Sequence, residues 1–367
     1  MEKKIFKALG LMSGTSMDGV DASIIESDGE TVLNAVSNHY FEYNKDLFNS
    51  LVNLKDKITN SKDLQNLSKE VNLLEREITL FHAEISNRII EKSKLKVDLI
   101  GFHGQTIFHN VDKKITKQLG EGKLLSQLIK TKVIYNFRQN DLINGGEGAP
   151  LTPIYHRLLV KLLAEKKKVI TPIIILNIGG IANKTFINSN YEINSMDIGP
   201  GNCLIDKWIR VNSDKNFDEN GNIARSGKVD KFILEQSLDN FYNNNISKKK
   251  SLDINDFDIS FARGLSLENG AATIIEFTAD ILSKKILDCD IYVSGGGRKN
   301  LFLIESIHKK IKNKIKQIDD LGVDGGFVES QAFAYLAIRS YLNLPISFPE
   351  TTGCKHPSTG GILVKNY

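Results

Sequence analysis

The chain has 367 residues, of which 41% are hydrophobic and 25% charged, a composition ordinary for a soluble globular protein. This length exceeds that of one usual hydrophobic core and predicts two domains. The formal net charge of +4 comes from scattered lysines, with short runs only at 166–168 and 248–250, so a nucleic-acid-binding surface is not expected.

Cysteine usage and the amino-terminal residues indicate the compartment. Cys203, Cys289 and Cys354 are widely separated, form no C-x-x-C motif and leave an odd count for disulfides. The first apolar stretch is interrupted by Gly10 and Asp18, which predicts neither a signal peptide nor a membrane span. We therefore expect a reduced, cytoplasmic protein that binds no membrane.

The chain opens with a predicted strand at 4–12, a polar turn at 13–19 and a returning strand at 20–26. The tip could present N–H groups and hydroxyls to phosphate oxygens, and Asp18 or Asp21 could hold a hydrated Mg²⁺. No Gly-Lys-Ser/Thr follows, so this is not a Walker A loop. Any tight turn also favours Gly, Ser and Asp, so the hairpin alone is a weak signal.

Residues 45–94 have apolar side chains at helical spacing and are expected to pack one face on a sheet. A short strand at 96–101 then brings His103 to its carboxyl end, where open α/β sheets bind ligands. A core histidine bonded to the backbone is the alternative. His109 lies six residues further on with no third ligand at matching spacing, so a metal site at these histidines is not expected.

The next predicted strand, at 133–137, ends in Arg138. An arginine there could grip a substrate carboxylate with two hydrogen bonds, and the alternative is an ion pair with Asp141. The glycine-rich loop 145–150 and a helix at 154–164 are expected to form the crossover between the domains.

The second half begins as the first does, with a strand at 173–176, a glycine turn at 177–183 and a strand at 184–187, which predicts a duplicated architecture. Asp197 follows in the segment Asp-Ile-Gly-Pro-Gly-Asn. The glycines permit close approach of a ligand, and the carboxylate could act as a general base. The alternative is an Asp that caps the helix expected at 204–211.

The last part of the chain predicts a helix at 265–286, a strand at 291–293 and a helix at 328–341 that carries Glu329 in its first turn. The turn at 294–300, between this strand and another helix, contains three successive glycines. Such a turn permits close approach of a flat group such as a nucleotide base.

Several long motifs, in this order along the chain, resemble those of the anhydro-N-acetylmuramic acid kinase family. They are Gly10–Asp21, Gly101–Thr106, Asn136–Arg138, Gly145–Pro150, Asn177–Asn183, Asp197–Asn202 and Val328–Tyr335. The resemblance implies an α/β, two-domain actin-like ATPase (ribonuclease H-like) fold with an interdomain cleft, which sugar kinases and the seventy-kilodalton heat-shock ATPase share. We expect one domain at 1–140 plus 345–367 and the other at 141–344.

The resemblance implies that water opens the 1,6-anhydro bridge at C1 while ATP phosphorylates O6, giving N-acetylmuramic acid 6-phosphate and ADP in peptidoglycan recycling and amino sugar catabolism. Asp197 would be the general base for the water, Glu329 a second catalytic carboxylate near the sugar, and Arg138 the partner of the lactyl carboxylate. Two alternatives are a conventional sugar kinase that phosphorylates a related amino sugar and an actin-like ATPase that binds a protein partner.

The cofactors that the resemblance implies are ATP and Mg²⁺, and the partners are a small amino sugar and ATP, with a homodimer as an option. The expected nucleotide contacts are Gly14, Thr15, Ser16, Met17, Asp18, Gly19, Val20, Asp21, Asn177, Gly179, Gly180, Gly295 and Gly296. The expected sugar contacts are Ser13, His103, Gln105 and Arg138. Asp21 is preferred over Asp18 for the metal. Lys248–Asn255 departs from the Pro-Lys-Ser-Thr-Gly-Arg of relatives, which leaves the role of this segment open.

Overall fold

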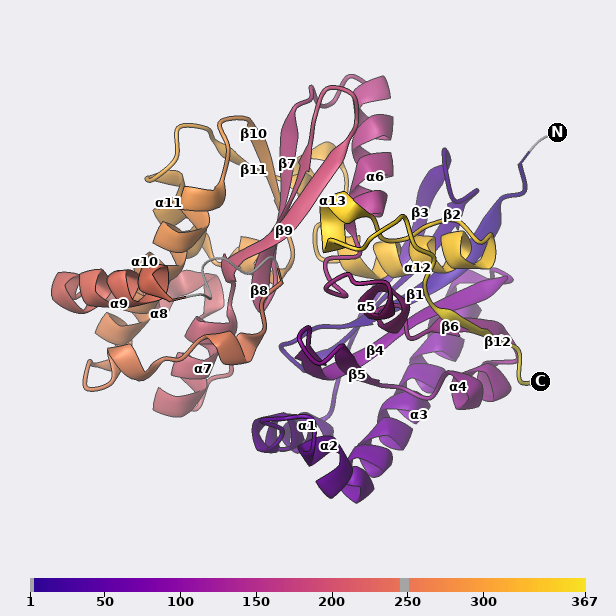
Figure 1. Ribbon diagram of the computed structural model, residues 1–367, viewed down its shortest axis with the longest axis horizontal. Helices are drawn as coiled ribbons and strands as arrows, with labels where there is room; N and C mark the ends of the chain where they lie inside the picture. The colour runs from indigo at the N-terminus through magenta and orange to yellow at the C-terminus, as the bar shows by residue number, and fades with distance from the viewer. Residues whose placement is uncertain (1–2, 245–250) are drawn as a thin grey trace. The chain divides into compact units, whose positions relative to one another are not determined.

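The computed structural model describes residues 3–244 and 251–367, and the chain divides into two compact units. Unit 1 comprises Met1–Leu162 and Phe327–Tyr367, and unit 2 comprises Leu163–Gly326. Each unit has its own sheet with helices packed against it, which confirms the expected α/β class (Figure 1).

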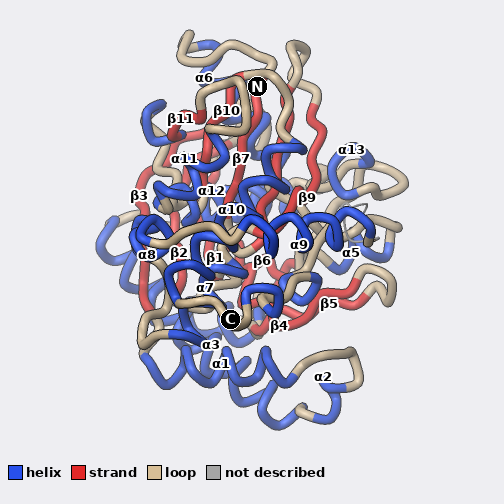
Figure 2. Tube along the Cα trace, turned by 90° about the vertical axis from the view of Figure 1, so that its left-hand side faces the viewer, coloured by secondary structure: helices blue, strands red, loops and turns tan. Residues whose placement is uncertain are grey.

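Unit 1 begins with an antiparallel meander and ends with a helix that returns to it. Its elements are β1 (Phe6–Ser13), β2 (Gly19–Ser27), β3 (Leu33–Glu42), α1 (Lys45–Lys57), α2 (Asp63–Asn66), α3 (Ser68–Ser93), β4 (Leu99–Asn110), β5 (Ile115–Leu119), α4 (Gly122–Ile129), β6 (Lys132–Tyr135), α5 (Gln139–Ile143), α6 (Pro153–Glu165), α12 (Val328–Tyr341), α13 (Pro349–Thr352) and β12 (Ile362–Val364). Figure 2 shows α1 and α2 beside α3, which they contact.

Unit 2 follows the same plan. Its elements are β7 (Ile173–Ile178), β8 (Ile181–Ile187), β9 (Ile193–Pro200), α7 (Cys203–Asn212), α8 (Asn222–Ser226), α9 (Lys231–Asn243), α10 (Leu267–Lys285), β10 (Asp290–Ser294), α11 (Leu301–His308) and β11 (Ile315–Gln317), with short 3₁₀ turns at Glu219–Gly221, Ile254–Asp256, Ser260–Ala262, Gly296–Lys299 and Ile318–Leu321.

Five strands of each sheet share the same order and directions, and the sheet of unit 1 adds β12, antiparallel to β6, and β5, antiparallel to β4. In unit 1 the order is β12-β6-β4-β1-β2-β3, in which β1, β2 and β3 are antiparallel and β4 and β6 run parallel to β1. In unit 2 the order is β11-β10-β7-β8-β9, in which β7, β8 and β9 are antiparallel and β10 and β11 run parallel to β7. This repeat confirms the predicted duplication and the two-domain, ribonuclease H-like class.

Two glycines allow α12 to lie directly on the sheet of unit 1. Gly10 of β1 and Gly101 of β4 are paired in register. A Cβ atom on Gly10 would overlap the carbonyl oxygen of Ser330, and one on Gly101 would overlap that of Phe333. The backbone of α12 therefore takes the space of the missing side chains, and the predicted helix at 328–341 is confirmed.

The core of unit 2 lies between its sheet and the helices α7 and α10. Buried side chains of β7 and β10 meet Trp208 of α7 and Ile275 of α10. Gly270 makes room for Trp208, because a Cβ atom there would overlap the indole ring. No helix in 3–244 or 251–367 is both long and apolar enough to span a membrane.

Residues 141–162 and 327–344, which we expected in the second domain, lie in unit 1. The loop that we expected to be the crossover is tied to the carboxy-terminal part of unit 1. The amide of Glu147 donates to the carbonyl of Thr352 (2.8 Å), and the Asp141 carboxylate accepts from the Gly148 amide (2.7 Å) and the Thr352 hydroxyl (2.7 Å). The chain leaves unit 1 within α6, the helix that we expected to form the second part of the crossover.

Candidate functional site

The candidate site residues fall on both units. In unit 1 the turn between β1 and β2 is the expected phosphate hairpin. Thr15, Ser16 and Asp18 are exposed at its tip, and the Ser16 hydroxyl donates to the Asp18 carboxylate (2.5 Å). The side chains of Met17 and Val20 are buried in the core of unit 1. A contact of either residue with a nucleotide would therefore come from the main chain.

Met17 shapes this turn. Its φ is +59°, which is uncommon for a residue other than glycine, and its amide donates to the carbonyl of Gly14 (3.2 Å). The buried thioether keeps the turn in place while its neighbours remain exposed. Gly19 is close to β3, since a Cβ atom there would overlap the Phe41 carbonyl oxygen, and Asp21 pairs with Tyr40 across β2 and β3.

Ser13 is buried behind the hairpin. Its hydroxyl lies 3.1 Å from His82 Nε2 and 3.0 Å from the Tyr43 hydroxyl. His82 Nδ1 is 2.7 Å from the Ile78 carbonyl, so it carries the proton, and Nε2 accepts from Ser13. Burial lowers the pKa of His82 to about 4, which keeps the ring neutral. Tyr43 and His82, which the sequence did not indicate, thus orient Ser13.

Gln105 supports the hairpin from β4. Its Nε2 donates to the carbonyl of Gly14 (2.8 Å), and the side chain is fully buried. Among the described residues, Oε1 of Gln105 has no hydrogen-bond partner. A buried acceptor without a partner is costly, so a ligand hydroxyl would satisfy it.

His103 and Arg138, two of the predicted sugar contacts, are in direct contact. Arg138 donates from Nη2 (3.0 Å) and Nε (3.2 Å) to His103 Nε2, and from Nη1 to the Gly148 carbonyl (2.8 Å). His103 Nδ1 donates to the Gly104 carbonyl (2.7 Å). Burial, followed by the Arg138 charge, holds the pKa of His103 well below its usual range. His103 is therefore neutral and orients the guanidinium without cancelling its charge.

The positions of both residues differ from expectation. His103 lies inside β4, because the strand continues to Asn110 where β5 supplies an antiparallel partner. Arg138 lies three residues beyond β6, at the start of α5, after Asn136 turns the chain with a φ of +58°. The two side chains are nevertheless brought together, so each fixes the position of the other.

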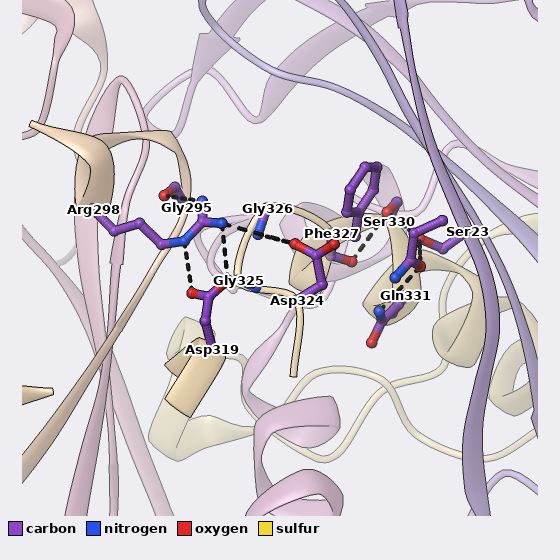
Figure 3. Close-up of polar contacts among 11 residues, drawn as sticks. Ser23, Gly295, Arg298, Asp319, Asp324, Gly325, Gly326, Phe327, Ser330 and Gln331 are labelled. Carbon is purple, nitrogen blue, oxygen red and sulfur yellow. Dashed lines mark hydrogen bonds and ion pairs between the residues drawn. The ribbon is translucent and has the colours of Figure 1, made fainter. Parts of the chain in front are cut away.

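Glu329 is half-buried in the first turn of α12. Ser330 next to it donates to the Phe327 carbonyl (3.0 Å) and lies 2.7 Å from the hydroxyl of Ser23 on β2 (Figure 3). Gln331 is buried and donates to Asn38 of β3 (3.2 Å). The turn that carries Glu329 is thus anchored to the sheet of unit 1.

In unit 2, Asp197 lies inside β9. Asn202 is the N-cap residue of α7, so the alternative that Asp197 caps this helix is wrong. Asp197 is 6% exposed, and its Oδ2 accepts a hydrogen bond from the Leu252 amide (2.8 Å). A buried carboxylate needs such donors.

Asn177, Asn183 and Asp197 form a polar row across three neighbouring strands. Asn177 of β7 pairs with Asn183 of β8, which pairs with Asp197 of β9. Directly paired residues of antiparallel strands project from the same face. Ser294 of β10 extends the row by donating to Asn177 (3.5 Å). Asn183 was not among the predicted site residues, although it ends the glycine turn that drew attention to Asn177.

The turn at Gly179 and Gly180 packs against the start of α7. The Gly179 carbonyl accepts from the Asn202 amide (2.8 Å), and the Gly180 carbonyl accepts from Gly201 (2.9 Å) and Cys203 (3.1 Å). A Cβ atom on Gly201 would overlap the Gly179 carbonyl oxygen. The segment of Asp197 and the glycine turn are therefore one packed structure.

The triple-glycine turn is held by Arg298, which the sequence did not single out. Arg298 donates to both oxygens of Asp319 (2.9 and 3.2 Å) and to the Gly295 carbonyl (3.1 Å), as Figure 3 shows. Gly295 has a φ of +82°, and a Cβ atom there would crowd the Asn177 side-chain oxygen at 2.5 Å. Gly296 is exposed, and a Cβ atom added there would meet no other atom within 4 Å. Gly295 thus adjoins the polar row, and Gly296 is open to a ligand.

Two glycines of unit 2 should respond differently to alanine. Gly201→Ala should destabilise the protein by about 1–3 kcal/mol, because the new methyl group must displace backbone. Gly296→Ala should change the free energy of unfolding by no more than about 0.5 kcal/mol, yet raise the KM for ATP if a nucleotide approaches this turn. Denaturant unfolding of both variants measures the changes in unfolding free energy, and initial-rate kinetics measure the KM for ATP. Equal unfolding free energies for the two variants would contradict the packing described.

The anhydro-N-acetylmuramic acid kinase family model matches residues 6–366. A curated anhydro-N-acetylmuramic acid kinase from Pelagibacter ubique (strain HTCC1062) is 54% identical to this chain over an alignment of 378 positions, which covers 100% of both chains. The anhydro-N-acetylmuramic acid kinase of Zymomonas mobilis subsp. mobilis is 37% identical over 96% of this chain and 98% of its own.

This chain belongs to the anhydro-N-acetylmuramic acid kinase family. The prediction of a kinase is therefore confirmed, as is the resemblance on which it rested. Among solved structures, the activator of 2-hydroxyisocaproyl-CoA dehydratase from Clostridium difficile with bound ADPNP aligns with 92% of this chain and 96% of its own, at 11% identity and a TM-score of 0.45. At that TM-score the likeness adds nothing to the topology described above.

A kinase of this family needs oxygen ligands if it is to hold Mg²⁺ beside a nucleotide. Within 3–244 and 251–367, no group of three or more His, Cys, Asp or Glu side chains could bind a metal by itself. Mg²⁺ typically takes one or two carboxylates, with waters and phosphates completing its shell. Asp21 pairs with Tyr40 across β2 and β3, and Glu42 lies two residues beyond Tyr40 on β3. Burial and the charges of Asp18, Glu42 and Asp21 raise the pKa of Tyr40. Asp18 and Asp21 thus supply carboxylates of the kind that a hydrated Mg²⁺ needs.

Proposed function

We propose that this kinase transfers the γ-phosphoryl group of ATP to O6 of 1,6-anhydro-N-acetylmuramic acid while water opens the anhydro bridge. The water oxygen bonds to C1 as the C1–O6 bond breaks, and Asp197 takes the proton of the water. O6 then bonds to the phosphoryl group, and ADP leaves. The products are N-acetylmuramic acid 6-phosphate and ADP, which would place the enzyme in cytoplasmic peptidoglycan recycling and amino sugar catabolism.

The observation that carries this proposal is the environment of Asp197. A general base must be held within hydrogen-bond reach of the proton that it takes. Asp197 is buried, one of its oxygens is bonded to the Leu252 amide, and its neighbours in the row, Asn183 and Asn177, are neutral. These features suit a carboxylate that activates a single water molecule in a site otherwise closed to solvent.

Arg138 would bind the lactyl carboxylate of the sugar. The neutral His103 ring and the Gly148 carbonyl orient its planar guanidinium, a group that can bind a carboxylate through two hydrogen bonds. Glu329 would act as a second carboxylate near the sugar, and Gln105 Oε1 would accept from a sugar hydroxyl. The hairpin from Gly14 to Asp21 would bind the phosphates of ATP.

Mg²⁺, when bound, would balance charge on the transferring phosphoryl group, and Asp21 or Asp18 would hold it. Of the variants Asp21→Asn and Asp18→Asn, one should require about 10-fold more Mg²⁺ for half-maximal rate, because loss of a supporting carboxylate weakens metal affinity. We expect the larger effect at Asp21. Normal Mg²⁺ titration curves for both variants would remove this hairpin from the metal site.

A coupled ADP-release assay tests the proposed function. The kinase should release ADP with the anhydro-sugar far faster than with N-acetylmuramic acid, whose bridge is already open. A preference for free N-acetylmuramic acid or another amino sugar would instead indicate a conventional sugar kinase that activates a hydroxyl directly.

A further inference from the structure

The segment Ser251–Phe257 reaches Asp197 from far along the chain. Within residues 3–244 and 251–367, β9 is the edge strand of the unit 2 sheet and pairs with β8 alone. The Leu252 amide donates to Asp197 Oδ2 at 2.8 Å, across 55 residues of sequence. The hydrogen bond is buried, with Leu252 9% and Asp197 6% exposed. Because this main-chain hydrogen bond to the proposed base is buried, water competes poorly with it.

The segment is anchored on both sides of this contact. The Leu252 side chain belongs to the core of unit 2, together with Ile198 and Ile205. At the other end, Phe257 stacks on Phe241 of α9, with ring centroids 6.2 Å apart and planes at 20°.

Between these anchors, Asp253 and Asp256 form a capping box around the 3₁₀ turn Ile254–Asp256. The Asp253 amide donates to Asp256 Oδ2 (2.9 Å), and Asp253 Oδ1 accepts from the Asn255 amide (2.9 Å). The turn is closed on itself by these bonds. The Leu252 amide is consequently held in place by packing on one side and by a rigid turn on the other.

A general base works only if one of its oxygens faces the water, and the supporting contacts of the carboxylate decide which oxygen that is. An N–H donor to Oδ2 restrains rotation about the Cβ–Cγ bond. We propose that the Leu252 amide is a positioning group for Asp197, which makes Ser251–Phe257 part of the catalytic machinery of unit 2. This inference rests on the proposed role of Asp197.

The hydrogen bond to Asp197 comes from the main chain, so it does not depend on the unusual side chains of this segment. Every residue except proline has this N–H group, and residues 251–255 contain no proline, so their departure from the pattern of relatives does not remove the donor. The part of that departure at 248–250 lies outside the described residues.

Replacing the Leu252 amide by an ester tests the inference. Leucic acid at position 252, introduced by nonsense suppression, deletes the N–H group and keeps the side chain. We expect kcat to fall by about 10- to 100-fold, the usual consequence of losing a hydrogen bond to a charged group. The KM values for ATP and the anhydro-sugar should stay within about two-fold, because the contact orients the base without touching substrate. Leu252→Pro, which also lacks the N–H, should reproduce the fall.

Ile307→Ala is the matched control, because it removes a buried aliphatic side chain from the same core of unit 2, in α11 and outside the segment Ser251–Phe257. It should lower the midpoint of thermal unfolding and leave kcat close to that of the wild type. An ester variant with wild-type kcat would overturn the inference, as would an equal loss of kcat in Ile307→Ala. If Asp197→Asn is inactive while the ester variant is normal, only the positioning role fails. If Asp197→Asn is active, the proposed general base fails.

Discussion

Asp197→Asn is expected to lower kcat by about 10²- to 10⁴-fold, the range typical for loss of a general base. The amide has nearly the shape of the carboxylate and can still accept from the Leu252 amide, so the local structure should persist. It cannot take a proton from water, however. ADP release with the anhydro-sugar measures the loss directly.

Asn194→Ala is a suitable control for that variant, since Asn194 is exposed on the same strand, β9, and should tolerate the change. Circular dichroism and calorimetric titration with ATP should give wild-type results for Asp197→Asn. Near-normal turnover by a correctly folded Asp197→Asn would show that another group, or none, activates the water.

Arg138→Lys is expected to raise the KM for the anhydro-sugar by about 10- to 100-fold and to change kcat less, because a charge-assisted pair is worth roughly 1.5–3 kcal/mol. Lysine keeps the charge but loses the planar fork that His103 Nε2 and the Gly148 carbonyl orient. Initial-rate kinetics at saturating ATP would measure both constants.

His103→Ala should also raise the KM for the anhydro-sugar, by less than Arg138→Lys does. Removing the neutral acceptor frees the guanidinium to move, so part of the same rise in KM should appear although no charge is lost. A sugar analogue without the lactyl group should bind both variants and the wild type equally. If the variants weaken binding of that analogue as much as binding of the natural sugar, Arg138 does not bind the lactyl carboxylate.

Much of the fold was predictable where a local pattern and the tertiary structure agree. The strand, turn and strand that open each half were recognised from apolar runs around glycines, and α12 from its buried, uninterrupted run. β3 was missed because it lies at a sheet edge with many exposed positions and lacks a clear apolar alternation. β11 and β12 are three residues long, too short for any periodicity.

In the candidate site, too, residues in local motifs were predictable from the sequence and those placed by tertiary packing were not. Motifs pointed to Asp197, Arg138 and the hairpin, because unusual glycine spacing around polar residues is visible locally. No local signal marks Leu252 as the donor to Asp197, since every residue except proline has an amide and the contact spans 55 residues. His82 behind Ser13 is another such case. Positioning groups of this kind depend on tertiary packing, and only the structure reveals them.

The composition of the phosphorylated product tests the central claim most directly. Mass spectrometry of a complete reaction with the anhydro-sugar and ATP should give a sugar that has gained one water and one phosphoryl group. Proton and phosphorus NMR should then place the phosphate on O6 and a free hydroxyl on C1, with one ADP formed for each bridge opened. A product that has gained a phosphoryl group without water, with its anhydro bridge intact, would contradict the account.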